Sequence, residues 1–262
     1  MRGNGFDGAL AAAKLHIRVG HVEAGFVSFD RMMPEEINRV VADHISDLLF
    51  APTETARQHL LNEGIEDKTI SVTGNTIVDA VFQNRDVSKE ESEYPWHSTE
   101  GLFPRHCPPA GECRFSRAPQ KHHPGDPRDP RGILTARPHP DAPPPRKMVE
   151  QFNIPLSGIT VIEPTGFFEF LHLESNARLI LTDSGGVQEE SCILGVPCVT
   201  LRNTTERPET IDVGANMLVG TGCDRIRAGV NEMVNARWVW ENPYGDGRAR
   251  VRIVESILGM KF

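Results

Sequence analysis

Several short stretches of the sequence carry residues whose types and spacing suit chemistry on an anionic ligand. The most informative is Asp183-Ser184-Gly185-Gly186, which follows an apolar run at residues 179–181 and opens a helical pattern that ends before Gly195. A second apolar run follows at residues 196–201. This order predicts a strand, a helix and a strand of one parallel sheet. Ligands of such sheets bind at the carboxyl ends of the strands, and the N–H groups that open the helix can bind a phosphate. The stretch therefore predicts an anion site at Ser184, Gly185 and Gly186.

Two glutamates in the first part of the chain are candidates for acid–base chemistry. Glu23 follows a predicted strand at residues 17–22, where a ligand would lie, although a carboxylate that only terminates a turn explains it equally well. Glu35 lies in the first turn of a helix predicted to begin at Pro34, where the helix dipole favours negative charge. Arg39 lies one turn later on the same face and can pair with Glu35. A surface ion pair is the commoner explanation of such spacing.

The elements that would position these residues alternate along the chain, which is typical of an α/β layer fold. In the first part, the pattern predicts a helix at 9–15, a strand at 17–22, a helix at 34–49, a strand at 48–52, a helix capped by Thr53 that ends near Gly64, a strand at 71–75 and a helix from Ile77. In the second part, it predicts a strand at 158–163, a helix at 167–173, the strand–helix–strand unit at 179–201, a strand at 217–219, and helices at 224–240 and 253–260.

Composition narrows the class of protein. The chain of 262 residues suffices for one large or two ordinary domains, and its net charge of −8 argues against a general nucleic-acid binder. No run of about 18 apolar residues occurs, so no membrane span is expected, and the N-terminus lacks the basic-then-apolar pattern of a signal peptide. Five scattered cysteines, an odd number, indicate reduced thiols in the cytoplasm rather than a disulfide framework.

A proline-rich stretch interrupts the alternation in the middle of the chain. Residues 101–150 hold 12 of the 20 prolines, and prolines are excluded from helix interiors and central strands. We therefore expect a linker or an irregular insertion over residues 84–147. Its two cysteines, Cys107 and Cys113, and its His122-His123 pair match no standard metal-site spacing, so no metal is predicted.

Seven motifs in a fixed order carry a resemblance to a known family. They are His21-Val22-Glu23-Ala24-Gly25, Pro34-Glu35-Glu36-Ile37-Asn38-Arg39, Ala51-Pro52-Thr53-Glu54, Val72-Thr73-Gly74-Asn75-Thr76, Leu181-Thr182-Asp183-Ser184-Gly185-Gly186-Val187-Gln188-Glu189-Glu190, Arg202-Asn203-Thr204-Thr205-Glu206-Arg207-Pro208-Glu209 and Asn242-Pro243-Tyr244-Gly245-Asp246-Gly247. With these motifs the chain resembles the non-hydrolysing UDP-N-acetylglucosamine 2-epimerases. The resemblance covers roughly residues 8–84 and 146–262.

The resemblance implies a fold, a reaction, and a cellular compartment and pathway. We expect an α/β protein with two Rossmann-like domains of the GT-B type, parallel sheets flanked by helices, the first domain largely truncated. The expected division is a remnant of that domain at 1–83, the proline-rich segment at 84–147 and a UDP-binding domain at 148–262. The family interconverts UDP-GlcNAc and UDP-ManNAc by eliminating UDP and adding it back, without a metal or redox cofactor. It also implies a cytoplasmic homodimer that serves cell-surface polysaccharide biosynthesis, with a UDP-sugar substrate and no nucleic-acid or membrane partner.

The resemblance further implies roles for individual residues. Catalysis would fall to Glu23 and Glu35, with Arg39 positioning them or contacting phosphate. The set that would bind the nucleotide comprises the diphosphate-binding Ser184, Gly185 and Gly186 and the ribose-binding Glu190. Arg207 and Glu209 receive no role.

The sequence departs from the family pattern at three places. It begins after the family's first strand, so a phosphate-binding arginine and a catalytic aspartate have no counterpart, and Val27 stands where the family often has arginine. The family's His-Arg-x-Glu-Asn motif is missing from the proline-rich segment, but one back-translation of residues 106–115, shifted by one base, reads His-Arg-Gln-Glu-Asn. We hypothesise that residues 97–146 are translated out of frame. The second sheet would then lose a central strand, and the chain would be marginally stable.

Two other functions stay open at this point. A hydrolysing relative would release UDP and free ManNAc. A non-catalytic remnant would bind a nucleotide sugar without turning it over.

Overall fold

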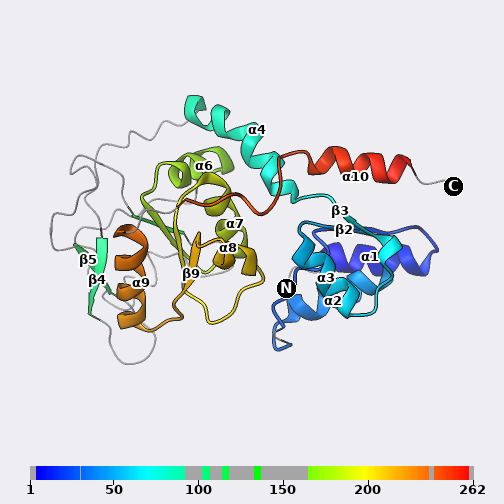
Figure 1. The fold of residues 1–262 in the computed structure, drawn as a ribbon, viewed down its shortest axis with the longest axis horizontal. Coiled ribbons are helices and arrows are strands. Elements are labelled where there is room, and N and C mark those ends of the chain that lie inside the picture. The colour runs from blue at the N-terminus through cyan, green and yellow to red at the C-terminus, as the bar shows by residue number, and fades with distance from the viewer. Residues whose placement is uncertain are drawn as a thin grey trace. The chain divides into compact units, whose positions relative to one another are not determined.

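The computed structural model describes residues 4–29, 31–91, 102–106, 114–117, 133–136, 165–235 and 239–259 (Figure 1). The chain forms two compact units. The N-terminal unit comprises residues 1–83, 204–209 and 242–262, and the second unit comprises residues 84–203 and 210–241. The last residues of the chain thus belong to the same unit as its first residues. The division at residues 83 and 147 that the sequence predicts stays a prediction.

The N-terminal unit is built on a parallel sheet of three strands in the order β1 (Gly20–Val22), β2 (Leu48–Ala51) and β3 (Ile70–Val72). Its helices are α1 (Asn4–Lys14), α2 (Pro34–Ile45), α3 (Glu54–Asn62), the beginning of α4 (Thr76–Glu91) and α10 (Ala249–Leu258), with a short 3-10 turn at Asp67–Thr69. One face of the sheet packs against α3 through buried side chains, namely Ala24, Leu49, Ala51, Ala56, Leu60 and Ile70.

The turn after β1 is fixed against the start of α3. Gly25 has φ +79°, and a Cβ there would lie 2.3 Å from the Ala56 carbonyl oxygen, so only glycine fits. Thr53 caps α3 as expected, because its hydroxyl accepts a hydrogen bond from the Ala56 amide at 3.1 Å. The chain segment that carries Glu23 is therefore held by backbone packing as well as by side chains.

The end of the chain packs onto the N-terminal unit through a buried aspartate. Asp79 on α4 accepts hydrogen bonds from the backbone amides of Ala249 at 3.0 Å and Arg250 at 3.3 Å. These amides open α10, whose dipole favours a carboxylate at that end. The preceding loop is tied down as well, since the Asn75 amide donates to the Tyr244 carbonyl at 2.9 Å.

The second unit contains a parallel sheet of four strands in the order β6 (Ile133–Ala136), β7 (Leu179–Thr182), β8 (Cys198–Thr200) and β9 (Asn216–Leu218). Its helices are α6 (Phe167–Ser175), α7 (Gly185–Leu194), most of α8 (Pro208–Asp212) and α9 (Cys223–Asn235). A separate antiparallel pair joins β4 (Leu102–His106) and β5 (Arg114–Arg117).

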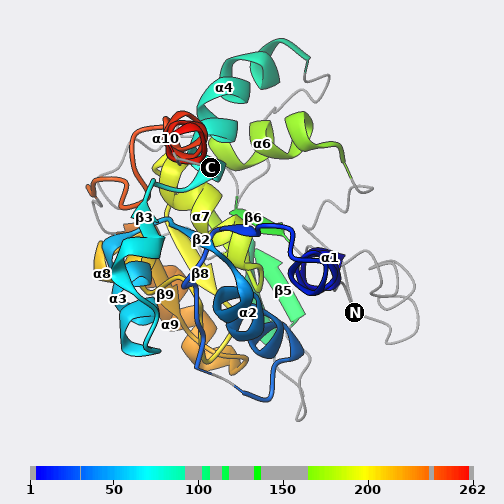
Figure 2. The ribbon, with the colours of Figure 1, turned by 90° about the vertical axis from the view of Figure 1, so that its right-hand side faces the viewer.

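Helices cover both faces of the second sheet, as its fully buried and mostly apolar strand β7 requires. Successive residues of β7 point to opposite faces. Leu179 and Leu181 pack with residues of α9, whereas Ile180 packs with Val187 of α7. Figure 2 shows α7 and α9 beside β8 and β9 (yellow to orange). The α7 helix ends at Gly195, which has the left-handed conformation predicted for its C-terminal stop.

The structure differs from the sequence-based expectations mainly in the proline-rich segment. An irregular segment was expected over residues 84–147, yet α4 extends to Glu91 and three strands lie within it. The second sheet was expected to lack a strand, but β6 pairs in parallel with β7. Residues 133–136, Ile-Leu-Thr-Ala, can pair in this way because they form a proline-free, largely apolar run within a proline-rich composition. The strand expected at 158–163 lies outside the described residues.

Smaller differences concern element ends. The helix expected over 34–49 ends at Ile45, because Leu48–Ala51 pairs with the sheet instead. The helix expected over 224–240 ends at Asn235, and the last helix begins at Ala249 rather than at residue 253.

Candidate functional site

A cavity of about 380 Å³ in the N-terminal unit brings two of the three predicted catalytic residues together. It is lined by α1, by the start of β1 and by α2, and its polar wall includes His21, Glu35, Asn38 and Arg39. Glu35 is exposed to solvent in the first turn of α2, where the sequence predicted it. One glutamate, one arginine and one histidine thus line the same cavity.

Glu23 lies two residues beyond His21, in the turn that follows β1, and is half-buried. It is not among the residues that line the cavity. Its φ is 65°, in the left-handed region that side chains other than glycine rarely adopt. Such a conformation costs about 1–3 kcal/mol and persists only where the surroundings impose it. His16 and Phe29 share this conformation, so the functional role of Glu23 stays a prediction.

His21 is a site residue that the sequence reasoning did not single out. Its Nδ1 lies 2.6 Å from Oδ1 of Asp43, a side chain on α2 that is almost wholly buried. The other oxygen of Asp43 accepts from the Gly25 amide at 3.3 Å. The place of His21 in the predicted strand just before Glu23 was the available signal.

Glu36, the second glutamate of the Pro-Glu-Glu motif, stabilises a loop. Glu36 is buried, and its carboxylate accepts hydrogen bonds from the Ser28 amide at 2.9 Å, the Ser28 hydroxyl at 3.0 Å and the Phe29 amide at 3.0 Å. It therefore holds the loop that follows the Glu23 turn. Adjacent helical residues point about 100° apart, so Glu36 can face this loop while Glu35 faces the cavity.

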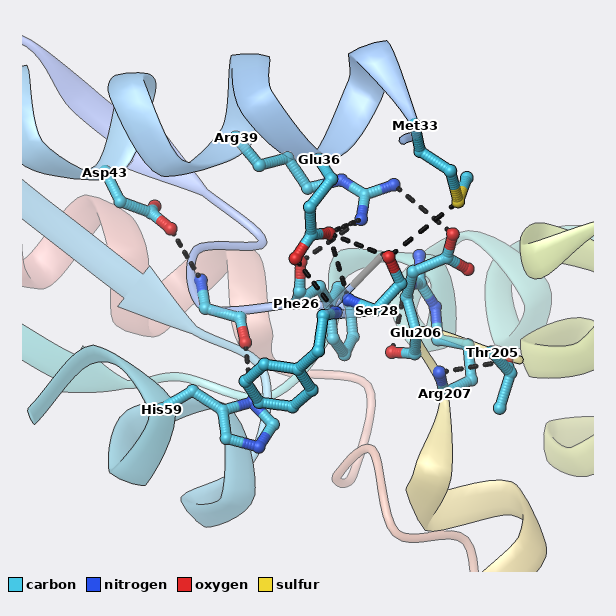
Figure 3. A network of polar contacts seen from close by, with 12 residues as sticks. Phe26, Ser28, Met33, Glu36, Arg39, Asp43, His59, Thr205, Glu206 and Arg207 are labelled. Atoms are coloured by element: carbon cyan, nitrogen blue, oxygen red, sulfur yellow. Dashed lines mark hydrogen bonds and ion pairs between the residues drawn. The ribbon is translucent and has the colours of Figure 1, made fainter. Parts of the chain in front are cut away.

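Arg39 does not pair with Glu35 as the four-residue spacing suggested. Its Nη1 instead donates to the Phe26 carbonyl at 3.2 Å and lies 3.6 Å from Glu36, and its Nη2 lies 3.9 Å from Glu206 (Figure 3). The expected pair fails because two carboxylates more buried than Glu35 lie within reach of the guanidinium. Arg39 thus links α2, the loop after β1 and the segment at residues 204–209.

That segment lies within the N-terminal unit although it is distant in sequence. The Arg207 guanidinium stacks over the Phe26 ring, 3.8 Å from its centroid, which is favourable cation–π geometry. Glu209 is buried and accepts a hydrogen bond from the Thr53 hydroxyl at 2.5 Å. Figure 3 shows Glu206 and Arg207 beside Phe26 and Ser28. Sequence reasoning left Arg207 and Glu209 without a role because their partners lie more than a hundred positions away.

In the second unit, the residues predicted to bind phosphate open α7. Ser184 is the N-cap residue, and Gly185 and Gly186 begin the helix. The first amides of a helix have no acceptor within it, so they are available to an anion. A Cβ added to Gly186 would meet only the Ser184 hydroxyl, at 3.9 Å. The protein itself therefore leaves open space above this glycine.

Glu190 lies one turn after Gly186 on the same face of α7 and is half-buried. Burial raises the pKa of its carboxyl to about 7, and the neighbouring Glu174 opposes that rise. The helix is fixed from its other side by a buried amide network. The Asn216 side chain donates to Gln188 of α7 at 3.2 Å, and its oxygen accepts from the Thr200 hydroxyl at 2.7 Å. These buried hydrogen bonds thus fix the helix that carries Gly186 and Glu190.

The family of the chain follows from comparison with known proteins. A sequence model of the UDP-N-acetylglucosamine 2-epimerases matches residues 2–103 and 131–258. The chain belongs to this family. The match confirms the family expected from the seven motifs. It resumes at residue 131 rather than at 146, so β6 lies inside it, and an out-of-frame segment would be confined to residues 104–130.

Individual relatives are similar over nearly the whole chain. The UDP-N-acetylglucosamine 2-epimerase of Methanocaldococcus jannaschii is 45% identical over 270 residues, which is 97% of this chain and 72% of the relative. The Escherichia coli K12 protein of that name is 36% identical over 280 residues, 95% of this chain and 71% of the relative.

Solved structures of family members share the fold. The crystal structure of the M. jannaschii UDP-GlcNAc 2-epimerase in complex with UDP-GlcNAc and UDP is similar at a TM-score of 0.78, with 43% identity, over 97% of this chain and 72% of that one. The Neisseria meningitidis UDP-GlcNAc 2-epimerase bound to UDP-GlcNAc gives a TM-score of 0.75, with 27% identity, over 97% and 73%. The α/β fold of the GT-B type expected from the sequence is confirmed.

Two features are absent from the described residues of the epimerase. No group of three or more His, Cys, Asp or Glu side chains in this part of the chain could hold a metal ion. None of its helices is both long enough and apolar enough to cross a membrane. Cys107, Cys113 and the His122-His123 pair lie outside the described residues.

Proposed function

We propose that this protein is a UDP-N-acetylglucosamine 2-epimerase, which interconverts UDP-GlcNAc and UDP-ManNAc by eliminating UDP and adding it back from the other face. The observation that carries the proposal is the similarity of nearly the whole chain to an enzyme of that name whose crystal structure holds UDP-GlcNAc and UDP. The arrangement of polar groups in each unit supports it independently.

The N-terminal unit would supply proton transfer. Inversion at C2 requires removal of a weakly acidic proton bound to carbon, and a positioned carboxylate is a suitable base. Glu35 is exposed at a cavity of a size that a sugar can enter, and Glu23 is held in a strained turn two residues after His21. We assign proton transfer to Glu23 and Glu35. Arg39, fixed by Glu36 and Phe26, would position this wall of the site or contact phosphate.

The second unit would bind the UDP leaving group. The diphosphate would lie at the amides of Gly185 and Gly186 with the Ser184 hydroxyl beside them, because helix N-termini stabilise developing negative charge. Glu190, on the same face one turn later, would accept hydrogen bonds from the ribose hydroxyls. This chemistry needs no metal or redox cofactor, since every step transfers a proton or breaks and reforms a C–O bond.

Incubation of the purified full-length chain with UDP-GlcNAc in D₂O tests the proposal. We expect UDP-ManNAc to form with deuterium at C2, because the abstracted proton exchanges with solvent before re-addition. Free ManNAc with stoichiometric UDP would instead identify a hydrolysing enzyme. UDP binding in titration calorimetry without any turnover would identify a binding remnant. E35Q serves as the chemical control, because Glu35 makes no hydrogen bond within the described structure whose loss could unfold the chain.

We further infer, from the family, a homodimer that acts in the cytoplasm. Cys192 and Cys198 are free thiols, whereas Cys223 is disulfide-bonded, contrary to the reduced thiols expected from the sequence. Light scattering after size-exclusion chromatography measures the oligomeric state, and a monomer at micromolar concentration would contradict a stable dimer.

A further inference from the structure

The amide side chain of Asn38, on α2, lines the cavity of the N-terminal unit beside the proposed base Glu35. Asn38 is half-buried, and its carboxamide makes no hydrogen bond with any residue that the structure describes. A carboxamide offers two N–H donors and one acceptor oxygen. These groups are partly withdrawn from water and stay available to a ligand in the cavity.

The charges near Asn38 favour a neutral ligand group there. The Arg39 guanidinium lies 3.6 Å from Glu36 and 3.9 Å from Glu206, so two carboxylates offset its positive charge. Glu35 is exposed, and its ionised carboxylate only accepts hydrogen bonds. An anion beside Glu35 would be repelled, whereas a neutral carbonyl oxygen can accept from the Asn38 amide.

The cavity wall changes from polar to apolar along one face of α2. Glu35, Asn38 and Ala42 are three and four residues apart, so they share this face, and all three line the cavity. Phe6 and Ala9 of α1 line the same cavity and add apolar surface. A carboxylate, a carboxamide and an apolar surface thus follow one another in this order.

The substituent at C2 of the proposed substrate carries groups that match this order. In UDP-GlcNAc an acetamido group is bonded to C2, the carbon whose proton Glu35 would transfer. Outward from C2, this substituent offers an N–H group, a carbonyl oxygen and a methyl group. The carbonyl oxygen can accept from an amide N–H, and the methyl group is most stable against apolar side chains.

We propose that Asn38 is a specificity-determining residue that donates a hydrogen bond to the carbonyl oxygen of the 2-acetamido group, with the methyl group packed against Ala42 and Phe6. The inference rests on the proposed function, in which Glu35 acts at C2. The contact distinguishes UDP-GlcNAc from UDP-glucose, because UDP-glucose carries a hydroxyl group at C2 and lacks both the carbonyl and the methyl group. A site that hydrogen-bonds a substrate group disfavours an analogue without it, since the polar group of the site is then left unpaired.

Two substitutions at Asn38 remove the donor. N38D keeps the size and shape of the side chain but replaces the amide nitrogen with an acceptor oxygen. N38L keeps a similar volume and has no polar group. N231L, at an exposed asparagine on α9, is the matched control. Circular dichroism and thermal unfolding of the full-length variants establish that each is folded.

Titration calorimetry compares three ligands, which are UDP, UDP-glucose, and a mixture of UDP-GlcNAc and UDP-ManNAc brought to equilibrium beforehand. The mixture presents the same ligands to every variant, because an enzyme does not alter the position of an equilibrium. The Kd of the mixture should rise roughly tenfold in N38D and N38L, as expected when one hydrogen bond to the ligand is lost. The Kd values of UDP and UDP-glucose should change far less, and N231L should match wild type for all three ligands.

Equal losses for all three ligands would show that Asn38 acts through the fold, and an unchanged Kd of the mixture would show that its amide is only hydrated. Either result overturns the inference, whereas incorporation of deuterium at C2 by wild type would leave the proposed function intact. Selective loss of binding to the acetamido sugars in both variants, with no turnover by wild type, overturns the proposed function and supports recognition by Asn38. A wild-type protein that binds none of the three ligands overturns both.

Discussion

The His21 ring and the Asp43 carboxylate are held together, with Nδ1 and Oδ1 2.6 Å apart. Because an ionised carboxylate only accepts, Nδ1 of His21 is the donor in this contact. The second Asp43 oxygen accepts from the Gly25 amide at 3.3 Å. One buried carboxylate therefore fixes both a ring at the cavity and the turn that carries Glu23.

Replacement of Asp43 should damage both stability and turnover. D43A leaves the Gly25 amide and the His21 ring without their acceptor, and the free energy of unfolding should fall by about 1–3 kcal/mol. D43N keeps one acceptor, so its loss of stability should be smaller, but its amide can impose the other tautomer of His21. We expect turnover of D43N to fall roughly tenfold or more. Urea unfolding and the epimerase assay measure the two effects. D224N, at a fully exposed side chain, should change neither.

The adjacent residues Glu35 and Glu36 should respond in opposite ways. Glu35 is exposed at the cavity, so E35Q should retain stability within about 0.5 kcal/mol while turnover falls by roughly 10²–10⁴. Glu36 is buried and accepts three hydrogen bonds from residues 28 and 29. E36Q loses the charge that strengthens them, and unfolding should become easier by about 1–3 kcal/mol. Equal stability losses in both variants would contradict this division of roles.

The Pro-Glu-Glu motif shows how far sequence reasoning reaches at the site. The helix start at Pro34 and the place of Glu35 followed from local rules, because first-turn preferences act within a few residues. The partners of Arg39 did not follow, because Glu206 approaches it from a loop that only the tertiary fold brings near. The same holds for Arg207 over Phe26 and for Asp43 behind His21. Local pattern thus placed Glu35 on its helix, whereas the contacts of Arg39, Arg207 and His21 depend on the tertiary fold.

The fold was predictable where apolar periodicity is strong. The unit from β7 through β8, with its stop at Gly195, has the predicted order because a short apolar run, a capping turn and a glycine each act locally. In the proline-rich segment, amino-acid composition did not predict β6, because the four proline-free residues 133–136 suffice to pair with an apolar strand such as β7. Composition averages over a window, whereas strand pairing needs only a short run.

Substitution of Gly186, at the start of a helix, and of Gly25, in a turn, should separate effects on folding from effects on ligand binding. G186A places a methyl group in open space within a helix, so stability should stay equal or rise by up to about 1 kcal/mol. The same methyl group would stand where a diphosphate approaches, and the Kd for UDP should rise at least about tenfold. G25A is the converse, since its Cβ would lie 2.3 Å from the Ala56 carbonyl oxygen at φ +79°. It should lose more than about 1 kcal/mol of stability. Calorimetric titration with UDP and thermal unfolding separate the two.

The stacking of Arg207 on Phe26 should appear as a coupling energy. A double-mutant cycle of R207M and F26L removes the charge or the ring while keeping apolar volume. At 3.8 Å from the ring centroid in a buried place, the coupling should be about 0.5–2 kcal/mol in the free energy of unfolding. Additive effects of the two single changes would show that the contact contributes only packing.

The buried acid Glu174 should make stability fall as pH rises. Its pKa in the folded chain is raised, first by burial and then by Glu190, so the fold favours the protonated form. The unfolded chain releases this proton near the ordinary glutamate pKa of about 4.3. Below that value the contribution of the protonated acid is fully present. Above it the unfolded chain binds fewer protons, and stability is lost by up to about 1.4 kcal/mol per pH unit until the folded pKa is reached.

E174Q does not titrate, so it isolates this effect from the other ionisable groups. The free energy of unfolding of E174Q minus that of wild type should grow steadily from about pH 5 to about pH 8, because only wild type must retain a proton in the folded state. Urea unfolding at fixed ionic strength across this range measures the difference. A difference that stays constant with pH would show that Glu174 ionises at its ordinary pKa in the folded chain.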